Sequence, residues 1–394
     1  MSQPANLRAR LDRLQRMALL VGATGFVLCG LGVYLNPTQF FRAYLLAYLF
    51  WLGMGLGCLA ILMVHYLAGG AWGAILRRTL ESGMCTLPLM ALLFVPLLFG
   101  LRELYSWANP EMVAGDEVLR QKSTYLNIPF FILRLAVYFL AWLTVAYVIN
   151  RWSRQHDQAT EWVTRDALAR RLALCSGVGL VIYSITMTFA AVDWAMSLEP
   201  HWYSTIYGIA FLVGQLLGAL AFAVVITALL ANDEPLVRMI TPEHLHDIGN
   251  LLITSVLFWA YIAFSQLVII WSGNLPEEIL WYVHRTQGGW QWVGLSLALF
   301  QFAVPFVLLL TRDIKRHVRR LGAIAAGILF MHLVDVFWTV MPAFYRQGPS
   351  LHWLDMGAVI GVGGVWITIF LWQLKARAFL PLHDPSLQGA VEHG

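Results

Sequence analysis

Charged side chains are scarce in this 394-residue chain. Lysine, arginine, aspartate and glutamate together make up 12% of the residues, compared with ~25% in an ordinary soluble domain. Hydrophobic residues make up 59%, and the mean hydropathy is +0.67. A soluble fold of this size needs a charged surface, so the composition excludes a soluble enzyme and a disordered chain. It predicts a polytopic helical membrane protein.

Cysteine is nearly absent, and no two cysteines form a CxxC pair. An iron–sulfur cluster needs about four thiolates at suitable spacing, and a structural zinc site needs a comparable set. The sequence also lacks a CxxCH haem-attachment motif, a phosphate-binding GxxxxGK[ST] loop and a dinucleotide fingerprint. We therefore expect the chain to bind no metal, haem or nucleic acid, and its cysteines to pack as small hydrophobic residues. These are Cys29, Cys58, Cys85 and Cys175.

Long apolar runs are abundant. About 20 residues are needed to cross a hydrocarbon core of ~30 Å, and ten runs approach or exceed this length. The ten predicted spans are 17–35, 43–67, 79–101, 127–150, 172–193, 203–230, 249–271, 290–310, 321–342 and 355–374. The first run is longer than a signal-peptide core, and no small-residue cleavage site follows it, so we expect it to remain a span.

The basic residues indicate how the chain is oriented. Nineteen of the 26 lysines and arginines fall in the two tails and the even-numbered connections, and six fall in the odd-numbered ones. Positive charge marks the cytoplasmic side, so we expect a basic cytoplasmic N-terminus at 1–16, one membrane domain at 17–374 and a cytoplasmic tail at 375–394. The long outer connections 102–126 and 272–289 are expected to lie at the membrane interface, because they carry aromatic residues. These are Trp107, Tyr125, Trp281 and Tyr282.

Two patterns recur along the chain. Arg170-Arg171-Leu172-Ala173 opens span 5, and Arg319-Arg320-Leu321-Gly322 opens span 9, 149 residues later. A GxxxG pair occurs in span 2 (Gly53 and Gly57) and in span 6 (Gly214 and Gly218). We interpret spans 2–5 (about 43–193) and spans 6–9 (about 203–342) as two repeated four-helix bundles flanked by spans 1 and 10. The glycines let helices approach closely.

His332 and Asp335 form the sharpest pair of polar residues inside a predicted span. A charge at the centre of a span costs roughly 2.5–3.5 kcal/mol on insertion scales. The spacing i, i+3 places both side chains on one helix face. A carboxylate beside an imidazole relays a proton or holds a quinol hydroxyl. The alternative is a structural pair that joins two helices.

Other charged residues in or beside the spans also admit two readings. Arg134 either reaches the outer interface or pairs with Asp193, and we favour the pairing. His65 and Glu81 either form a cytoplasmic proton entrance or extend to the headgroups. Asp193 and Asp355 lie at outer ends, where we expect them to be interfacial. Four uncharged polar side chains are expected to form helix–helix hydrogen bonds: Gln215, Ser265, Gln266 and Gln301.

Two stretches carry a family resemblance. The first is DWAMSLEPHWYSTIYG at 193–208, and the second runs from WAYIAFSQ at 259–266 to WSGNLPEE at 271–278. Together they resemble the NrfD/PsrC-type ten-span membrane subunits of alternative complex III. The shorter ActF-like subunit is more similar than its larger ActC-like sister, and the resemblance extends over nearly the whole chain.

The resemblance implies a role in respiratory or photosynthetic electron transport in the bacterial cytoplasmic membrane. Such complexes pass electrons from menaquinol or ubiquinol to cytochrome c or a similar periplasmic carrier. Their c-type haems and iron–sulfur clusters are held by partner subunits, namely a multihaem cytochrome and an iron–sulfur protein. The ActC-like sister is the usual site of quinol oxidation. An ActF-like chain is then a cofactor-free partner that is not catalytic alone and provides structure and a possible proton path.

The resemblance and the buried charges together give two groups of candidate site residues. The proton-path candidates are His332, Asp335, His65, Glu81, Arg134 and Asp193. The outer-face candidates, for quinol or for docking of extrinsic subunits, are Glu199, His201, Ser265, Gln266, Asn274, Glu277 and Glu278. Two other functions remain open: a stand-alone secondary transporter and a purely structural anchor of the complex.

Overall fold

The computed structural model describes residues 5–233 and 236–376, and these residues form helices and connecting segments without a strand. Ten helical segments are long and apolar enough to cross a membrane. The predicted fold class, an all-α protein with ten spans, is therefore confirmed. The last residues of the predicted tail, 377–394, and the first four residues lie outside the described part.

Seven of the ten spans are single helices, one contains a π-helical turn, one is split by two breaks, and one ends in a short 3-10 turn. In chain order they are α1 (Ala5–Leu35), α2 (Pro37–Ala68), α3–α5 (Ala71–Met84, Leu87–Leu93 and Val95–Phe99), α9 (Ile128–Gln158), α10 (Trp162–Trp194), α11 (Tyr207–Leu230), α13 (Pro242–Gly273), α15–η3–α16 (Trp290–Leu297, Ala298–Ala303 and Val304–Leu310), α18 with η4 (Val318–Val340 and Met341–Ala343) and α19 (Trp353–Lys375).

Short helices connect the spans. They are α6 (Leu101–Leu104), η1 (Ser106–Ala108), α7 (Pro110–Gly115), α8 (Glu117–Lys122), η2 (Met196–Leu198), α12 (Leu236–Met239), α14 (Pro276–Thr286) and α17 (Arg312–Arg316).

Several helices begin before the apolar runs that predicted them. The basic segment expected at 1–16 is helical from Ala5 and continues into span 1. Span 5 was expected to begin at residue 172 but begins at Trp162. An apolar run marks only the part of a helix that crosses hydrocarbon. Backbone hydrogen bonding continues through polar residues in water, so composition alone sets these helix starts too late.

Proline explains the irregular spans. Span 3 was expected as one helix, but it breaks at Cys85–Thr86 and again at Phe94, just before Pro88 and Pro96. In span 8 a π-helical turn precedes Pro305. Proline lacks a backbone N–H and its ring clashes with the carbonyl four residues earlier, so a helix changes geometry there.

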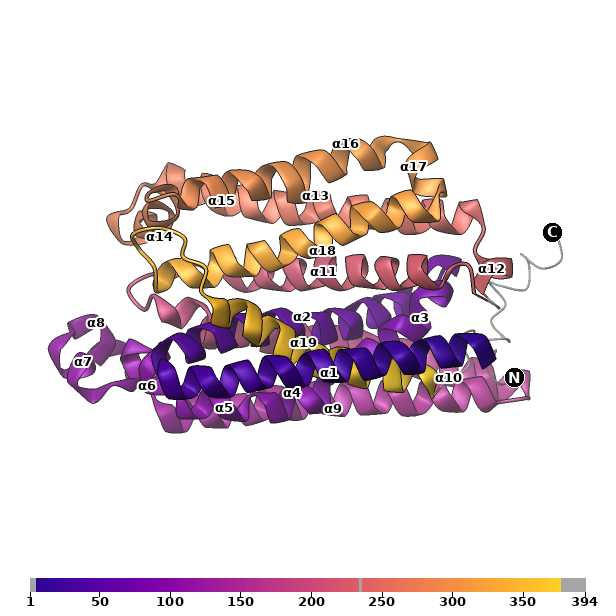
Figure 1. Ribbon diagram of the computed structural model, residues 1–394, viewed down its shortest axis with the longest axis horizontal. Helices are drawn as coiled ribbons and strands as arrows, with labels where there is room; N and C mark the ends of the chain where they lie inside the picture. Colours follow the sequence, from indigo (N-terminus) through magenta and orange to yellow (C-terminus); the bar gives the residue numbers. More distant parts are fainter. Residues whose placement is uncertain (1–4, 234–235, 377–394) are drawn as a thin grey trace.

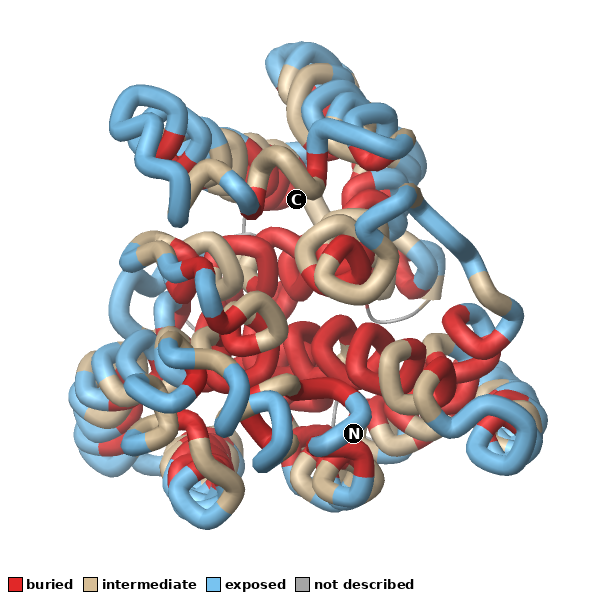
Figure 2. The backbone as a smooth tube through the Cα atoms, turned by 90° about the vertical axis from the view of Figure 1, so that its left-hand side faces the viewer, coloured by how far each residue is buried: buried red, intermediate tan, exposed pale blue. Residues whose placement is uncertain are grey.

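The spans run side by side along the long axis of the molecule (Figure 1). One end, which we call the basic end, carries α12, α17 and both ends of the described chain. The opposite end, the loop end, carries α6–α8 and α14. Viewed from the loop end, the buried segments gather at the centre and the peripheral helices expose their outer faces (Figure 2). Both ends of the described chain thus lie at the same end of the molecule, as an even number of spans requires.

Two groups of helices meet at α2 and α11. The first group packs α2 against α3, α4 and α10, and α10 against α9, while the second packs α11 against α13 and α18. At the crossing, Gly57 leaves no room for a Cβ atom against the backbone of Gln215, so this glycine has the predicted packing role. Spans 1 and 10 pair with each other through Gly25 and Gly361, and span 10 also packs against α2. That the two groups are repeats of one unit stays a prediction.

Candidate functional site

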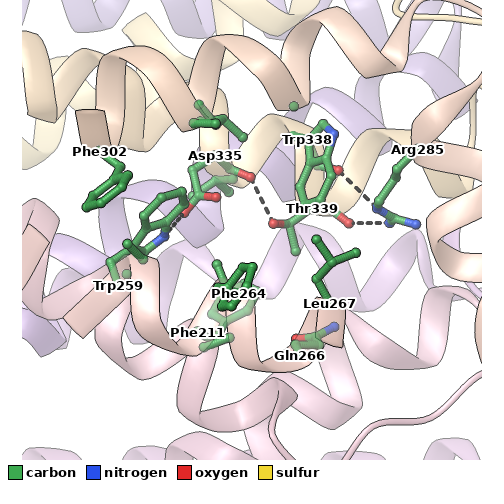
Figure 3. Close-up of a pocket in the computed structure, with 18 of the residues that line it drawn as sticks. Phe211, Trp259, Phe264, Gln266, Leu267, Arg285, Phe302, Asp335, Trp338 and Thr339 are labelled. Atoms are coloured by element: carbon green, nitrogen blue, oxygen red, sulfur yellow. Dashed lines mark hydrogen bonds between the residues drawn. The ribbon is translucent and has the colours of Figure 1, made fainter. Parts of the chain in front are cut away.

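A cavity of about 670 Å³ lies within the second group of helices (Figure 3). Its wall comes from α11, α13, α14, α15, η3 and α18, with Leu49 of α2 added. Most of the lining side chains are apolar or aromatic, and a few polar ones are placed among them. This size and composition are typical of a site for a small organic molecule.

His332 and Asp335 both line this cavity, as their shared helix face predicted. The Nδ1 atom of His332 lies 3.9 Å from Oδ2 of Asp335. The indole Nε1 of Trp259, on α13, donates a 3.1 Å hydrogen bond to the same oxygen. His332 is buried, whereas the Asp335 side chain keeps 16% of its surface exposed. The carboxylate is therefore accessible from the cavity and oriented from a neighbouring helix.

Two glycines of α11 make room for these side chains. A Cβ atom at Gly218 would clash with the ring of His332, because it would lie only 2.9 Å from the ring nitrogen Nε2. At Gly214 a Cβ would lie 3.4 Å from His332 Cε1 and 3.6 Å from Asp335 Oδ2. The GxxxG pair of span 6 therefore shapes the polar centre of the cavity in addition to helix packing.

Three buried polar atoms of the cavity wall have no hydrogen-bond partner within the described part of the chain. They are Nε2 of Gln266, Nδ1 of His332 and Nε1 of Trp338. Roughly 90% or more of buried polar groups in proteins are paired, so each exception needs an explanation. Three exceptions around one cavity indicate a polar ligand or water that completes their hydrogen bonds. Gln266 was expected to bond to another helix; its Nε2 makes no such bond within the described residues, and a bond through its Oε1 stays a prediction.

Gln301 and Gln215 differ from Gln266 in their surroundings. Gln301 is fully buried and both amide atoms are unpaired within residues 5–233 and 236–376, yet it is not part of the cavity wall. The predicted helix–helix hydrogen bond of Gln301 is therefore wrong. Gln215 accepts a 2.8 Å hydrogen bond from Tyr183, as predicted. Ser265 is half-buried beside Gln266.

Arg285 closes the cavity at the loop end. Its guanidinium donates to the carbonyls of Trp338 and Thr339, at 3.3 and 2.8 Å, and to Glu199 Oε2 at 3.0 Å. The other carboxylate oxygen of Glu199 lies 3.0 Å from Nδ1 of His284. Burial acts to raise the pKa of Glu199, but Arg285 and His284 hold that pKa below its usual value. Glu199 therefore attaches the connection between η2 and α11 to α14, and Arg285 attaches α14 to the end of α18.

The predicted pairing of Arg134 with Asp193 is present. Arg134 Nε and Nη2 donate to the two oxygens of Asp193 at 2.8 and 2.9 Å, and Tyr138 donates a third bond of 2.8 Å. Asp193 is fully buried inside the protein, which its place at the outer end of a span did not predict, and its interfacial depth stays a prediction. The cause of the burial is the connection 102–126, which folds over the helix end: Tyr105 donates to the Trp194 carbonyl at 2.9 Å.

Asp355, the second carboxylate expected at an interface, is also buried inside the protein. It is 2% exposed, accepts a 3.2 Å bond from Gln39 and caps α19 through the His352 backbone N–H at 2.8 Å. Trp107 and Trp281, expected at the interface, are also buried against the helices, at 3% and 4% exposure. Sequence position alone does not predict whether another segment of the chain covers these residues.

Glu81 lies in a buried cluster of charges near the basic end. Both of its oxygens are engaged, by Arg77 at 3.0 Å and by Arg78 at 2.8 Å, and Ser153 bonds to it as well. It is fully buried, so it does not extend to the headgroups. Two guanidinium groups thus occupy both carboxylate oxygens, which favours a structural role over proton transfer. His65 is buried in the same region and packs against Trp72.

The remaining outer-face candidates lie at helix ends outside the cavity. His201 contacts Asp116 across 2.7 Å, and the Leu119 backbone N–H and His201 both lower the pKa of that carboxyl. Asn274 ends α13 in the left-handed conformation, with a φ of 46°. Glu277 and Glu278 occupy the first turn of α14, where the helix dipole favours carboxylates.

Sequence reasoning missed four residues that shape the site: Trp259, His284, Arg285 and Trp338. Trp259 lies in the second stretch that carries the family resemblance, at 259–266, and Trp338 shares the helix face of His332 and Asp335. Arg285 follows Trp281 at i, i+4, and its guanidinium carbon lies 3.7 Å from that ring centroid. An arginine on the apolar face of an amphipathic segment was the available signal.

No known family model matches this chain. A search of curated proteins likewise finds no significant match.

Proposed function

We propose that this chain is a cofactor-free membrane subunit of a quinol:electron-acceptor oxidoreductase of the alternative complex III type, and that its cavity binds quinol. The carrying observation is the apolar cavity, whose wall holds Asp335 and three buried polar atoms without a partner among the described residues. A quinol needs an apolar cavity for its ring and polar partners for two hydroxyl groups. His332 and Asp335 supply acceptors on α18, and Gln266 supplies a donor on α13.

Access from the membrane supports a lipid-soluble ligand. Tyr261 and Phe264 of α13 line the cavity and are 66% and 65% exposed. The cavity therefore reaches the apolar surface of the helix bundle, which faces lipid in a protein of ten spans. A quinol dissolved in the bilayer would enter sideways through this opening. A polar transport substrate would need a water-filled route from each side.

The basic end supports the proposed orientation. Most lysines and arginines fall in the two tails and the even-numbered connections, and α12, α17 and both ends of the described chain lie at this end (Figure 1). The positive-inside rule then places the basic end in the cytoplasm and the loop end in the periplasm. The cavity would open nearer the periplasmic face, where a multihaem cytochrome or an iron–sulfur partner would take the electrons. The sister NrfD-type subunit is the proposed partner within the membrane.

A purification separates this proposal from the transporter alternative. The tagged chain is extracted from its native membrane in a mild detergent, and the visible spectrum of the eluate is recorded. We expect c-type haem bands from partner subunits, because this chain has no CxxCH motif of its own. A transporter would be recovered alone, without haem and with full stability. A structural anchor would bring haem but show no quinol binding in its cavity.

A further inference from the structure

A second cavity, of about 300 Å³, lies at the loop end. Its wall combines the end of α8, the turn that follows it, the end of α10 and the connection from α10 to α11. Figure 1 shows α8 at this end of the molecule. Part of the wall comes from the stretch 193–208, one of the two that carry the family resemblance. The lining residues from that stretch are Met196, Ser197, Pro200, Trp202 and Tyr203.

Lys122 supplies the charge of this second cavity. Its Nζ atom donates a 2.6 Å hydrogen bond to the carbonyl of Pro200 and lies 5.7 Å from the ring centroid of Tyr203. An ammonium group carries three donors, so this single bond leaves donors for a ligand. Within the described part of the chain, Lys122 is the only lining residue with a charged side chain.

No carboxylate of the protein neutralises Lys122 within residues 5–233 and 236–376. Burial lowers the pKa of Lys122, because lost hydration destabilises the ammonium and no ion pair offsets the loss. A bound anion would offset it. The carboxylates in or beside α8 and the connection to α11 each contact another basic side chain. They are Asp116 with His201, Glu117 with Arg120, Asp193 with Arg134 and Glu199 with Arg285.

The second cavity lies just outside the ends of spans 4 and 5. Its wall residues at 122–126 precede α9, which begins at Ile128, and those at 196–203 follow α10, which ends at Trp194. Phospholipid headgroups occupy this depth of a bilayer. The cavity reaches the surface at Tyr203, which is 53% exposed. An amphiphile at the end of the spans can therefore reach Lys122.

The remaining wall suits the apolar part of such an amphiphile. Leu126, Val192, Met196 and Trp202 present carbon surface to the cavity. The hydroxyl of Ser197 is already engaged, since it donates to the Asp193 carbonyl and accepts from the Trp107 indole at 3.1 Å. The cavity thus combines one open cation with an apolar wall, which matches an anionic head joined to hydrocarbon.

We propose that the second cavity binds the headgroup of an anionic phospholipid, with the phosphate on Lys122. Lysine binds phosphate as a point charge. Choline and ethanolamine headgroups add a cation, for which the described wall offers no carboxylate. The lipid would join the turn after α8 to the connection that leads into α11. This inference is independent of the proposed function, because the larger cavity is built from other residues.

Native mass spectrometry of the purified full-length chain in detergent tests the proposal. Phosphatidylglycerol, phosphatidylcholine of the same chain length, or glycerol 3-phosphate is added, and the bound molecules per protein are counted. We expect saturable binding of phosphatidylglycerol, tighter than that of the other two. Lys122→Gln should weaken it about tenfold, the loss expected for one hydrogen bond from a charged group. Arg120→Gln is the control, because it removes the same charge from an exposed side chain of the same helix.

Two further variants keep the test decisive if Lys122→Gln does not fold. Val192→Phe retains the lysine but fills the cavity from α10, and it should lose the lipid. Lys122→Arg retains the charge and should keep it. Equal phosphatidylglycerol binding by wild type, Lys122→Gln and Val192→Phe would overturn the site, and so would an equal loss in Arg120→Gln. Binding of phosphatidylcholine or glycerol 3-phosphate as tight as that of phosphatidylglycerol would overturn the assignment to an anionic lipid.

Discussion

Trp259 and Asp335, on neighbouring helices α13 and α18, are joined by a 3.1 Å hydrogen bond from the indole Nε1 to the carboxylate Oδ2. This bond fixes one oxygen of the acid that faces the cavity. The carboxylate lies 3.9 Å from His332, and both side chains occupy space left by glycines of α11. Three helices therefore build the polar centre of an otherwise apolar site.

The glycine of α11 beside His332 should be intolerant of a side chain. Gly218→Ala would place a Cβ against the imidazole, which has to move. We expect quinone affinity to fall by at least about tenfold, equivalent to ~1.4 kcal/mol. Titration of the purified variant with a short-chain quinone measures this. Gly177→Ala is the matched control, since its nearest neighbour would be Leu67 at 3.8 Å; equal losses in both variants would refute a specific role for Gly218.

Gln266 and Gln301 form a natural comparison. Both are buried and both have an unpaired Nε2 within the described residues, but only Gln266 lines the cavity. Gln266→Leu should weaken quinone binding about fivefold, because a ligand hydrogen bond contributes about 1 kcal/mol. Gln301→Leu should leave binding unchanged and raise the thermal midpoint, since it removes an unsatisfied polar group. Weaker binding in Gln301→Leu would show that the cavity boundary is misplaced.

Arg134 and Asp193 should act as a structural pair. Arg134→Leu leaves a buried, unpaired carboxylate, which costs about 3–5 kcal/mol. We expect a lower thermal midpoint in detergent, and partial recovery in Arg134→Leu/Asp193→Leu, where both charges are gone. Quinol turnover per folded complex should stay near wild type in the double variant. A loss of turnover without a loss of stability would instead indicate that Arg134 and Asp193 belong to a proton path.

We expect acidification to loosen the attachment of α14 by protonating Glu199. The pKa of Glu199 is lowered in the folded protein, so its ionised form stabilises the fold above the ordinary value of about 4.3. That contribution disappears as the pH falls through the lower, folded pKa. We expect the fluorescence of Trp281, which packs under Arg285, to stay constant from neutral pH down to about pH 4 and to change below it. In Glu199→Gln the acid transition should be absent; a transition that persists there would assign it to another carboxyl group.

The spans were predictable because the length of an apolar run is a local property. His332 and Asp335 were predictable for the same reason, since i, i+3 spacing fixes a shared face. The burial of Asp193 was not predictable, because it depends on the distant connection 102–126, which folds over it. Arg285 was counted as one of the few basic residues of the outer side, and only the packed position of α14 shows that it closes a cavity. Contacts between segments far apart in the chain carry this information, and composition does not.

Quinone binding to the purified full-length chain tests the central claim most directly. The chain is placed in lipid nanodiscs and titrated with a short-chain ubiquinone and a short-chain menaquinone, and quenching of tryptophan fluorescence is recorded, because Trp259 and Trp338 line the cavity. We predict saturable quenching that is weakened in Asp335→Asn and Gln266→Leu and unchanged in Gln301→Leu. Quenching that does not saturate with either quinone, or that is the same in all four proteins, would contradict a quinol site in this chain.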